Sequence, residues 1–174
     1  MRTITVRKGS GEGAMYSAGW HELSISKARY GDYKDSKFLD VWFKDYPDNF
    51  NARIYAKSSK DGEEFAIGRV FRFTNAGIKE ALDGPENTVV LKVDDNPEEL
   101  VGKTANVFFY QDGEYKRVLS QFAPTAFTGK ADTFSDDDVN YWKERAEKYY
   151  TDFIKPKTEV SNGVSSKEVD QVFG

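Results

Sequence analysis

Apolar and polar residues alternate with a period of two over much of the chain, which predicts β-strands. Successive side chains of a strand point to opposite faces, so a half-buried strand alternates in this way. The alternation is most regular in FNARIYAK, and the Asp-Gly pair at 112–113 is typical of a tight hairpin turn. The predicted strands span residues 19–30, 37–44, 50–57, 104–110 and 115–122.

The second predicted strand, KFLDVWFK, carries bulky apolar side chains on both of its faces. Alternation divides it into an apolar face, with Leu39, Val41 and Phe43, and a mixed face, with Phe38, Asp40, Trp42 and Lys44. Either the sheet is covered on both sides, or the mixed face is aromatic because something flat stacks on it. We expect the apolar face to lie in the core and Phe38 and Trp42 to point outward.

Two segments change to the 3–4 spacing of an amphipathic helix, residues 67–82 and 135–155. The first is predicted to end at Asp83-Gly84-Pro85, and 89–93 has the composition of a short strand. The second begins at Ser135, because a capping serine followed by three aspartates suits the positive end of the helix dipole.

Three strands, a helix and a two-stranded hairpin follow the element order of the OB barrel. We therefore expect a mainly β protein, a five-stranded OB-like antiparallel barrel with a helix between strands 3 and 4 and a C-terminal helix. A small antiparallel sheet with one covering helix fits the same order. The predicted organisation is a flexible N-terminal arm at 1–18, an OB-like domain at 19–130, the C-terminal helix at 131–155 and a disordered tail at 156–174.

The residue types present exclude several kinds of chemistry. The chain has no Cys and a single His, His21, which excludes disulfides, thiolate zinc sites and sites with two imidazoles. Gly102-Lys103-Thr104 matches the end of a phosphate loop, but Pro97 stands where the motif needs its first glycine, and a strand is predicted to follow. We expect no catalysis, no metal and no cofactor, with His21 in a structural role.

Charge and hydropathy limit the compartment and the partners. No apolar run approaches the roughly 18 residues of a membrane helix, and the N-terminus has no apolar signal core, so we expect a soluble, cytoplasmic protein without membrane contact. The net charge of −4 comes from the C-terminal region. Residues 1–130 carry 19 Lys/Arg and 19 Asp/Glu, whereas residues 131–174 carry 6 Lys/Arg and 10 Asp/Glu. A neutral body binds nucleic acid only where its cations converge.

Aromatic and cationic residues recur together on the face opposite the predicted core, and 15% of all residues are aromatic. Single-stranded nucleic acid needs this combination, because each base stacks on a ring for about 1–3 kcal/mol while Lys and Arg neutralise the phosphates. We expect nucleic-acid binding by Arg29, Lys34, Lys37, Phe38, Trp42, Lys44, Arg53, Tyr55, Lys57, Arg69, Arg72, Phe108, Tyr110, Tyr115 and Arg117. The alternative is that these aromatics line the second side of a covered barrel or pack under the C-terminal helix. Arg53 and Lys57 argue against it, because two cations on one strand face resist burial.

Over residues 18–125 the chain resembles a known family. The run GWHELSISKARYGDYKDSKFLDVWFKDYP, the helix AIGRVFRF and the segment EELVGKTANVFFY resemble phage-encoded replication proteins of the OB-fold type that bind single-stranded DNA. The resemblance implies cooperative coating of single strands during phage DNA replication or recombination, in the host cytoplasm and without catalysis.

The C-terminal region leaves the partners open. Many single-stranded-DNA-binding proteins recruit replication proteins through an acidic tail with a terminal Phe, whereas here SSKEVDQVFG has two acids and a glycine after Phe173. The C-terminal helix either caps the barrel or forms a homo-oligomer through Trp142, Tyr149 and Phe153. The alternative function is a protein-interaction or virion structural module without nucleic-acid binding, which the neutral body favours.

Overall fold

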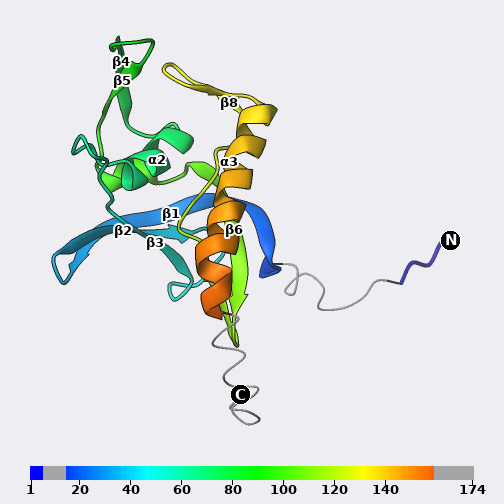
Figure 1. Ribbon diagram of the computed structural model, residues 1–174. Helices are drawn as coiled ribbons and strands as arrows, with labels where there is room; N and C mark the ends of the chain where they lie inside the picture. Colours follow the sequence, from blue (N-terminus) through cyan, green and yellow to red (C-terminus); the bar gives the residue numbers. More distant parts are fainter. Residues whose placement is uncertain (6–14, 159–174) are drawn as a thin grey trace.

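The computed structural model describes residues 1–5 and 15–158, and the protein is mainly β (Figure 1). Its largest element is an antiparallel sheet of five strands in the order β3-β2-β1-β6-β7. These strands are β1 (Gly19–Tyr33), β2 (Ser36–Phe43), β3 (Asn51–Tyr55), β6 (Thr104–Asp112) and β7 (Tyr115–Val118). The other elements are α2 (Ala66–Phe73), β4 (Ile78–Asp83), β5 (Val89–Val93), the short helix η1 (Pro97–Leu100), β8 (Phe127–Thr128), β9 (Thr133–Phe134), α3 (Asp136–Tyr149) and the π-helix η2 (Tyr150–Ile154).

The long strand β1 joins the two halves of the sheet. Its first residues pair with β6, from Gly19 opposite Phe109, and its later residues pair with β2, from Ile25 opposite Phe43. A β-bulge between Ile25 and Lys27 lies where the partner changes, and a bulge bends a strand and increases its twist. The sheet curls so that its two outer strands, β3 and β7, contact each other.

The hairpin of β1 and β2 is longer than predicted. The predicted strand ends at Tyr30, whereas β1 continues to Tyr33 and returns through a two-residue turn. Lys34 and Asp35 form this turn with φ of 48° and 65°, the conformation that a two-residue hairpin requires. As a result, the end of this hairpin extends beyond the body of the protein (Figure 1).

The core lies between the inner face of the sheet and α2. Leu39, Val41 and Phe43 are buried on this face, as the alternation predicted. Ile67 and Phe71 of α2 belong to the same buried cluster. Burial of each such side chain stabilises the fold by about 1.5–3 kcal/mol, so this layer is the main source of stability.

Packing begins within the segment that the sequence assigned to a flexible arm. Tyr16 lies edge-on to Tyr46 and Phe50, with ring centroids 5.4 and 5.3 Å apart. The hydroxyl of Tyr46 donates a hydrogen bond of 2.7 Å to the carbonyl oxygen of Met15. Residues 15–18 are therefore part of the body, while 6–14 of the predicted arm lie outside the described residues.

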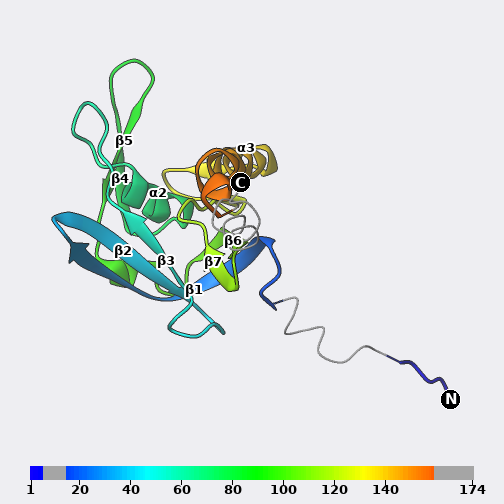
Figure 2. The same cartoon turned by 60° about the horizontal axis from the view of Figure 1, so that its bottom comes forward.

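The first helix is shorter than predicted. It ends at Phe73, whereas the spacing of apolar residues predicted a helix as far as residue 82. Asn75 and Gly77 have φ of 56° and 66°, which turns the chain, and a Cβ at Gly77 would overlap the carbonyl oxygen of Asp94. Residues 78–83 instead pair with β5 in a ribbon that projects from the body (Figures 1 and 2). The prediction was wrong because the apolar residues of β4 happen to follow the same 3–4 spacing as those of α2, so the sequence pattern does not show where the helix ends.

The C-terminal helix begins where the sequence placed it. Ser135 accepts a hydrogen bond from the backbone N–H of Asp138, and the Asp138 carboxylate accepts one from the backbone N–H of Ser135. This reciprocal pair is a capping box, which satisfies two donors that a helix start leaves free. After α3 the chain continues as η2 and then as a helical turn at 155–158. The rest of the predicted tail, 159–174, lies outside the described residues.

The helix α3 and the following η2 pack against the outer side of the sheet. Trp20 of β1 donates from Nε1 to the carboxylate of Glu147, at 2.6 Å. Tyr150 contacts the rings of Phe108 and Tyr110 of β6, each with centroids 5.3 Å apart. Phe108 and Tyr110 are consequently half-buried. For these two residues the structure agrees with the alternative interpretation of the sequence, in which aromatic side chains pack under the C-terminal helix.

Candidate functional site

Three rows of paired residues cross the outer face of β1, β2 and β3. The rows are Lys27–Trp42–Asn51, Arg29–Asp40–Arg53 and Gly31–Phe38–Tyr55. In the middle row, Arg53 donates from Nε and Nη2 to the two carboxylate oxygens of Asp40, at 2.8 and 2.9 Å. Asp40 is only 3% exposed. The hydrogen bonds with Asp40 raise the pKa of Arg53 above the ordinary value for arginine. The guanidinium therefore stays positively charged.

Phe38 and Trp42 belong to this outer face, as predicted, but each is only 8% exposed. Lys27 and Arg29 lie over the ring of Trp42, 4.5 and 5.4 Å from its centroid. The guanidinium of Arg53 lies over Phe38 at 3.8 Å. The two rings point outward as predicted but are covered, by cations from the neighbouring strands and, for Trp42, also by the chain at Asp48, whose carbonyl oxygen accepts from Trp42 Nε1 at 2.9 Å.

Tyr55 is an aromatic residue of this face that stays open. It is 38% exposed and lies edge-on to Phe38, with centroids 5.6 Å apart. Glycine at position 31 makes room for Phe38, because a Cβ there would lie 2.5 Å from the ring. The open ring of Tyr55 therefore lies next to Phe38, which the guanidinium of Arg53 covers.

A hollow of about 330 Å³ lies where β3 and β7 meet, and we call it the β3–β7 groove. Asn51 and Arg53 of β3 line one wall, Lys116 and Arg117 of β7 line the other, and Tyr110 of β6 contributes its ring. Burial raises the pKa of Tyr110, and its hydroxyl, which carries its proton at neutral pH as in any tyrosine, can donate a hydrogen bond. Three cations thus converge on one hollow of a body that is neutral overall.

Two of these cations already have carboxylate partners. Arg53 is paired with Asp40, and Arg117 donates from Nε to Asp112 at 2.6 Å. Among residues 1–5 and 15–158, Lys116 has no carboxylate within ion-pair distance. A guanidinium with one partner keeps further N–H donors, since it has five. The groove can therefore bind an anionic chain without breaking its internal ion pairs.

The other predicted residues of the β1–β2 hairpin and of the β6–β7 turn are dispersed. Lys34 lies over Tyr33 at 5.3 Å, and Lys37 pairs with Asp32 at 3.4 Å, both near the tip of the hairpin. Lys44 is exposed just after β2. Tyr115 is exposed beside Arg117, whose guanidinium lies 5.4 Å from its centroid.

Arg72, a predicted binding residue on α2, is engaged within the fold. Its Nε and Nη2 donate to the two carboxylate oxygens of Asp132, at 3.0 and 3.2 Å, and its guanidinium lies over Phe134. These contacts join α2 to the loop between β8 and β9. Arg72 therefore holds two elements together and does not point into the β3–β7 groove.

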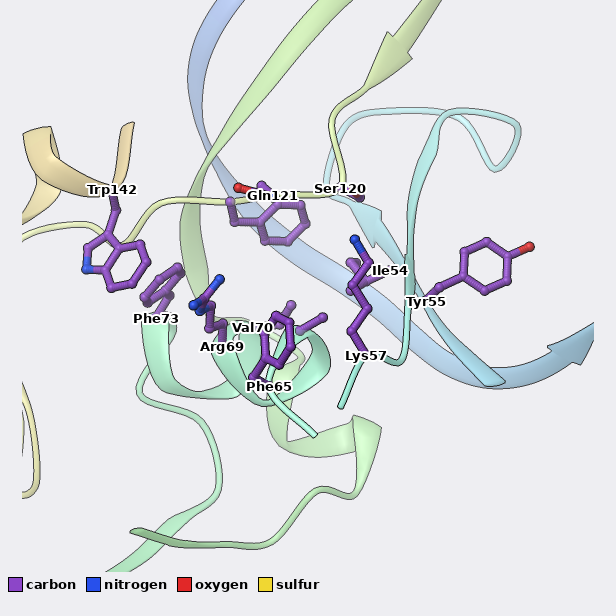
Figure 3. Close-up of a pocket in the computed structure, with 12 residues that line it drawn as sticks. Ile54, Tyr55, Lys57, Phe65, Arg69, Val70, Phe73, Ser120, Gln121 and Trp142 are labelled. Atoms are coloured by element: carbon purple, nitrogen blue, oxygen red, sulfur yellow. The ribbon is translucent and has the colours of Figure 1, made fainter. Parts of the chain in front are cut away.

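Lys57 and Arg69, the last two predicted residues, share a second hollow, which we call the α2–α3 pocket. It lies between the end of β3, α2, α3 and the segment 120–122 (Figure 3). Lys57 was predicted to share a face with Arg53, but it follows the last residue of β3 and reaches this pocket instead. Trp142, which the sequence offered as an oligomer contact, packs on Phe73 here, with centroids 4.9 Å apart.

The sequence pattern missed Lys27, Lys116 and Gln121. Lys27 pairs with Trp42 because of the bulge in β1, and a bulge leaves no mark in the alternation. Lys116 follows the Asp-Gly turn, so the hairpin signal could have placed it beside Arg117. Gln121 lines the α2–α3 pocket, and nothing in the sequence connects it with α2.

Comparison with known proteins yielded no match among family models, curated proteins or solved structures. No helix within the described ranges is long and apolar enough to cross a membrane. Within the same ranges, no three His, Asp or Glu side chains are grouped so that they could hold a metal ion.

Proposed function

We propose that this protein binds single-stranded DNA with little sequence preference, in the β3–β7 groove and along the outer face of β1, β2 and β3. The observation that carries the proposal is the convergence of Arg53, Lys116 and Arg117 with Tyr110 on one hollow. Cations that track a phosphate backbone beside rings that stack on bases are the common means of binding single strands. The resemblance to phage single-stranded-DNA-binding proteins extends the proposal to a role in DNA replication or recombination.

The order of the strands supports an OB-type barrel as the framework of this site. The order β3-β2-β1-β6-β7, with β3 against β7, is the OB order when α2 and the β4–β5 ribbon are counted as the connection between the third and fourth barrel strands. OB folds bind oligonucleotides on the face of their second and third strands, beside the loops that join strands 1–2 and 4–5. On an OB framework, the rows around Asp40 and the β3–β7 groove would correspond to these places.

The covered rings of the outer face suggest how a strand is held. A cation over an aromatic ring is worth about 0.5–1 kcal/mol at an exposed site, whereas a base stacked on a ring is worth about 1–3 kcal/mol. A base can therefore displace Lys27 or Arg29 from Trp42, and the displaced cation is then free to bind the adjacent phosphate. Tyr55, which is already open, offers a stacking position that requires no such exchange.

The groove can be tested with the double variant Lys116→Gln/Arg117→Gln. Because both side chains line the groove, we expect its affinity for a fluorescently labelled oligothymidine to fall and the salt dependence of binding to decrease. The matched control is Lys79→Gln/Lys92→Gln, which removes the same charge from the β4–β5 ribbon. Equal losses of DNA affinity in the two double variants would show that only the net charge matters. The β3–β7 groove would then not be the binding site.

One observation favours the alternative, a protein-interaction or virion structural module. The β4–β5 ribbon projects from the body (Figure 2) and exposes Leu82, Val89, Val90 and Val93. A two-stranded ribbon is only marginally stable alone, and exposed apolar patches often mark protein contacts. This alternative predicts a protein that associates with itself or with a partner and is insensitive to oligonucleotide.

A further inference from the structure

The α2–α3 pocket holds an arginine with two aromatic rings close to its guanidinium group. The guanidinium carbon of Arg69 lies 5.1 Å from the ring centroid of Phe65 and 5.0 Å from that of Trp142. Arg69 and Lys57 both extend toward the segment that carries Ser120 and Gln121, whereas Tyr55 points away from it (Figure 3). The N–H groups on the edge of this guanidinium are its hydrogen-bond donors, so they are the groups that can bind an anion.

The two cations of this pocket lack a carboxylate partner in the part of the chain that the structure describes. Within residues 1–5 and 15–158, neither Lys57 nor Arg69 has a carboxylate within ion-pair distance. Burial, and after it the charges of Arg145 and Arg72, lower the pKa of Arg69. A partly buried charge without a partner is costly, so an anion supplied from outside would relieve the cost.

The pocket has room for an anionic group. Its free volume is about 50 Å³, which is more than the about 10–15 Å³ that a single water requires. A phosphate or carboxylate group is the kind of anion that suits this space. The edge of a guanidinium matches the oxygens of such a group through two parallel hydrogen bonds, and the Ser120 and Gln121 side chains that line the pocket can donate to it.

The pocket and the β3–β7 groove are neighbours, because Ser120 lines both hollows. We propose that the α2–α3 pocket is a phosphate subsite, in which Arg69 and Lys57 bind one phosphodiester group of a strand whose neighbouring nucleotides occupy the groove. The inference rests on the proposed function and adds to it a contact away from the aromatic face. Free phosphate presents the same chemistry, and the experiment below separates the two sources.

The test measures binding of the full chain to labelled oligothymidine over a series of salt concentrations. Arg69→Met keeps an unbranched side chain between the two rings and removes the charge, and Lys92→Met on β5 is the matched control. Each phosphate contact contributes about −0.7 to the slope of log K against log salt, so we expect Arg69→Met to make the slope less negative by about 0.7. Loss of a charge-assisted hydrogen bond should also weaken binding about tenfold or more.

A second measurement keeps the test decisive if Arg69→Met does not fold. The Nε–H signal of Arg69 in the wild-type protein, followed by ¹⁵N NMR, should shift when oligothymidine is added. A slope for Arg69→Met equal to that of Lys92→Met, or an unmoved Arg69 signal while the protein binds DNA, overturns the subsite and leaves the proposed function standing. A signal that inorganic phosphate or an acidic peptide shifts, but oligothymidine does not, also overturns it. Absence of any binding to oligothymidine overturns both proposals.

Discussion

Arg53 and Asp40 lie opposite each other on β3 and β2, and two hydrogen bonds of 2.8 and 2.9 Å join the guanidinium to the carboxylate. The carboxylate is buried, whereas the Arg53 side chain is 45% exposed. The same guanidinium covers Phe38 and lines the β3–β7 groove. This single pair therefore connects the packing of the outer face with the charge of the candidate site.

Replacing Asp40 with Asn should destabilise the protein without abolishing binding. Asn removes the charge that holds Arg53 and leaves a buried polar group with poorer hydrogen bonds. We expect a loss of about 1–3 kcal/mol in the free energy of unfolding, measured with urea, less than for a fully buried pair because Arg53 is partly solvated. Asp32→Asn, at the exposed pair with Lys37, is the control and should change stability by less than about 0.5 kcal/mol. Equal effects of the two variants would mean that the Asp40 pair contributes no more than a surface ion pair.

Tyr55→Ala should weaken DNA binding while leaving the fold nearly unchanged. The ring lies at the surface of the outer face and is 38% exposed. One lost stacking position is worth about 1–3 kcal/mol, which is about a 5- to 150-fold loss of affinity for oligothymidine. Tyr141→Ala removes an exposed tyrosine from α3, outside the groove, and should leave the affinity unchanged. Unchanged affinity in Tyr55→Ala would show that the bound DNA does not contact the outer face at Tyr55.

Two glycine variants test where the first helix ends. Gly68 lies inside α2, and a Cβ there meets only Glu64 at 3.8 Å, so Gly68→Ala should stabilise the protein by about 0.5–1 kcal/mol. Gly77 has a positive φ, and a Cβ there would overlap the backbone of Asp94, so Gly77→Ala should destabilise it, by more than about 1 kcal/mol. Urea unfolding measures both. A helix that continued to residue 82 would instead give stabilisation in both variants.

Alkaline pH should destabilise the protein partly through Tyr30. Burial, and after it the charges of Asp95 and Glu64, raise the pKa of Tyr30 to about 12, and its hydroxyl donates to the carbonyl oxygen of Asp95 at 2.8 Å. The unfolded chain titrates near pH 10. The contribution of Tyr30 to stability is therefore complete below about pH 10 and is lost as the pH rises toward about 12. Tyr30→Phe should show a weaker pH dependence of urea unfolding over this range, and Tyr115→Phe, at an exposed ring, should behave like the wild type.

Local signals in the sequence predicted the parts of the fold that local physics decides. The inner face of Leu39, Val41 and Phe43 follows from alternation alone, and the start of α3 follows from the capping chemistry of Ser135. The end of α2 could not be predicted in this way, because it depends on the close approach of Gly77 to a residue far along the chain.

The candidate site was only partly predictable for a similar reason. The pattern correctly assigned Phe38 and Trp42 to the outer face, but exposure depends on which cations the neighbouring strands place above them. The bulge in β1 brings Lys27 over Trp42, and the curl of the sheet brings Lys116 toward Arg53. Both contacts arise from tertiary geometry, which a pattern of alternation does not contain.

The most direct test of the central claim is the binding of the full-length protein to labelled oligothymidine at salt concentrations from about 50 to about 200 mM, read by fluorescence anisotropy. The proposed function predicts binding at low salt and a linear fall of log K with log salt, with a slope of about −0.7 for each phosphate contacted. Absence of binding at low salt, or an affinity that salt leaves unchanged, would contradict it.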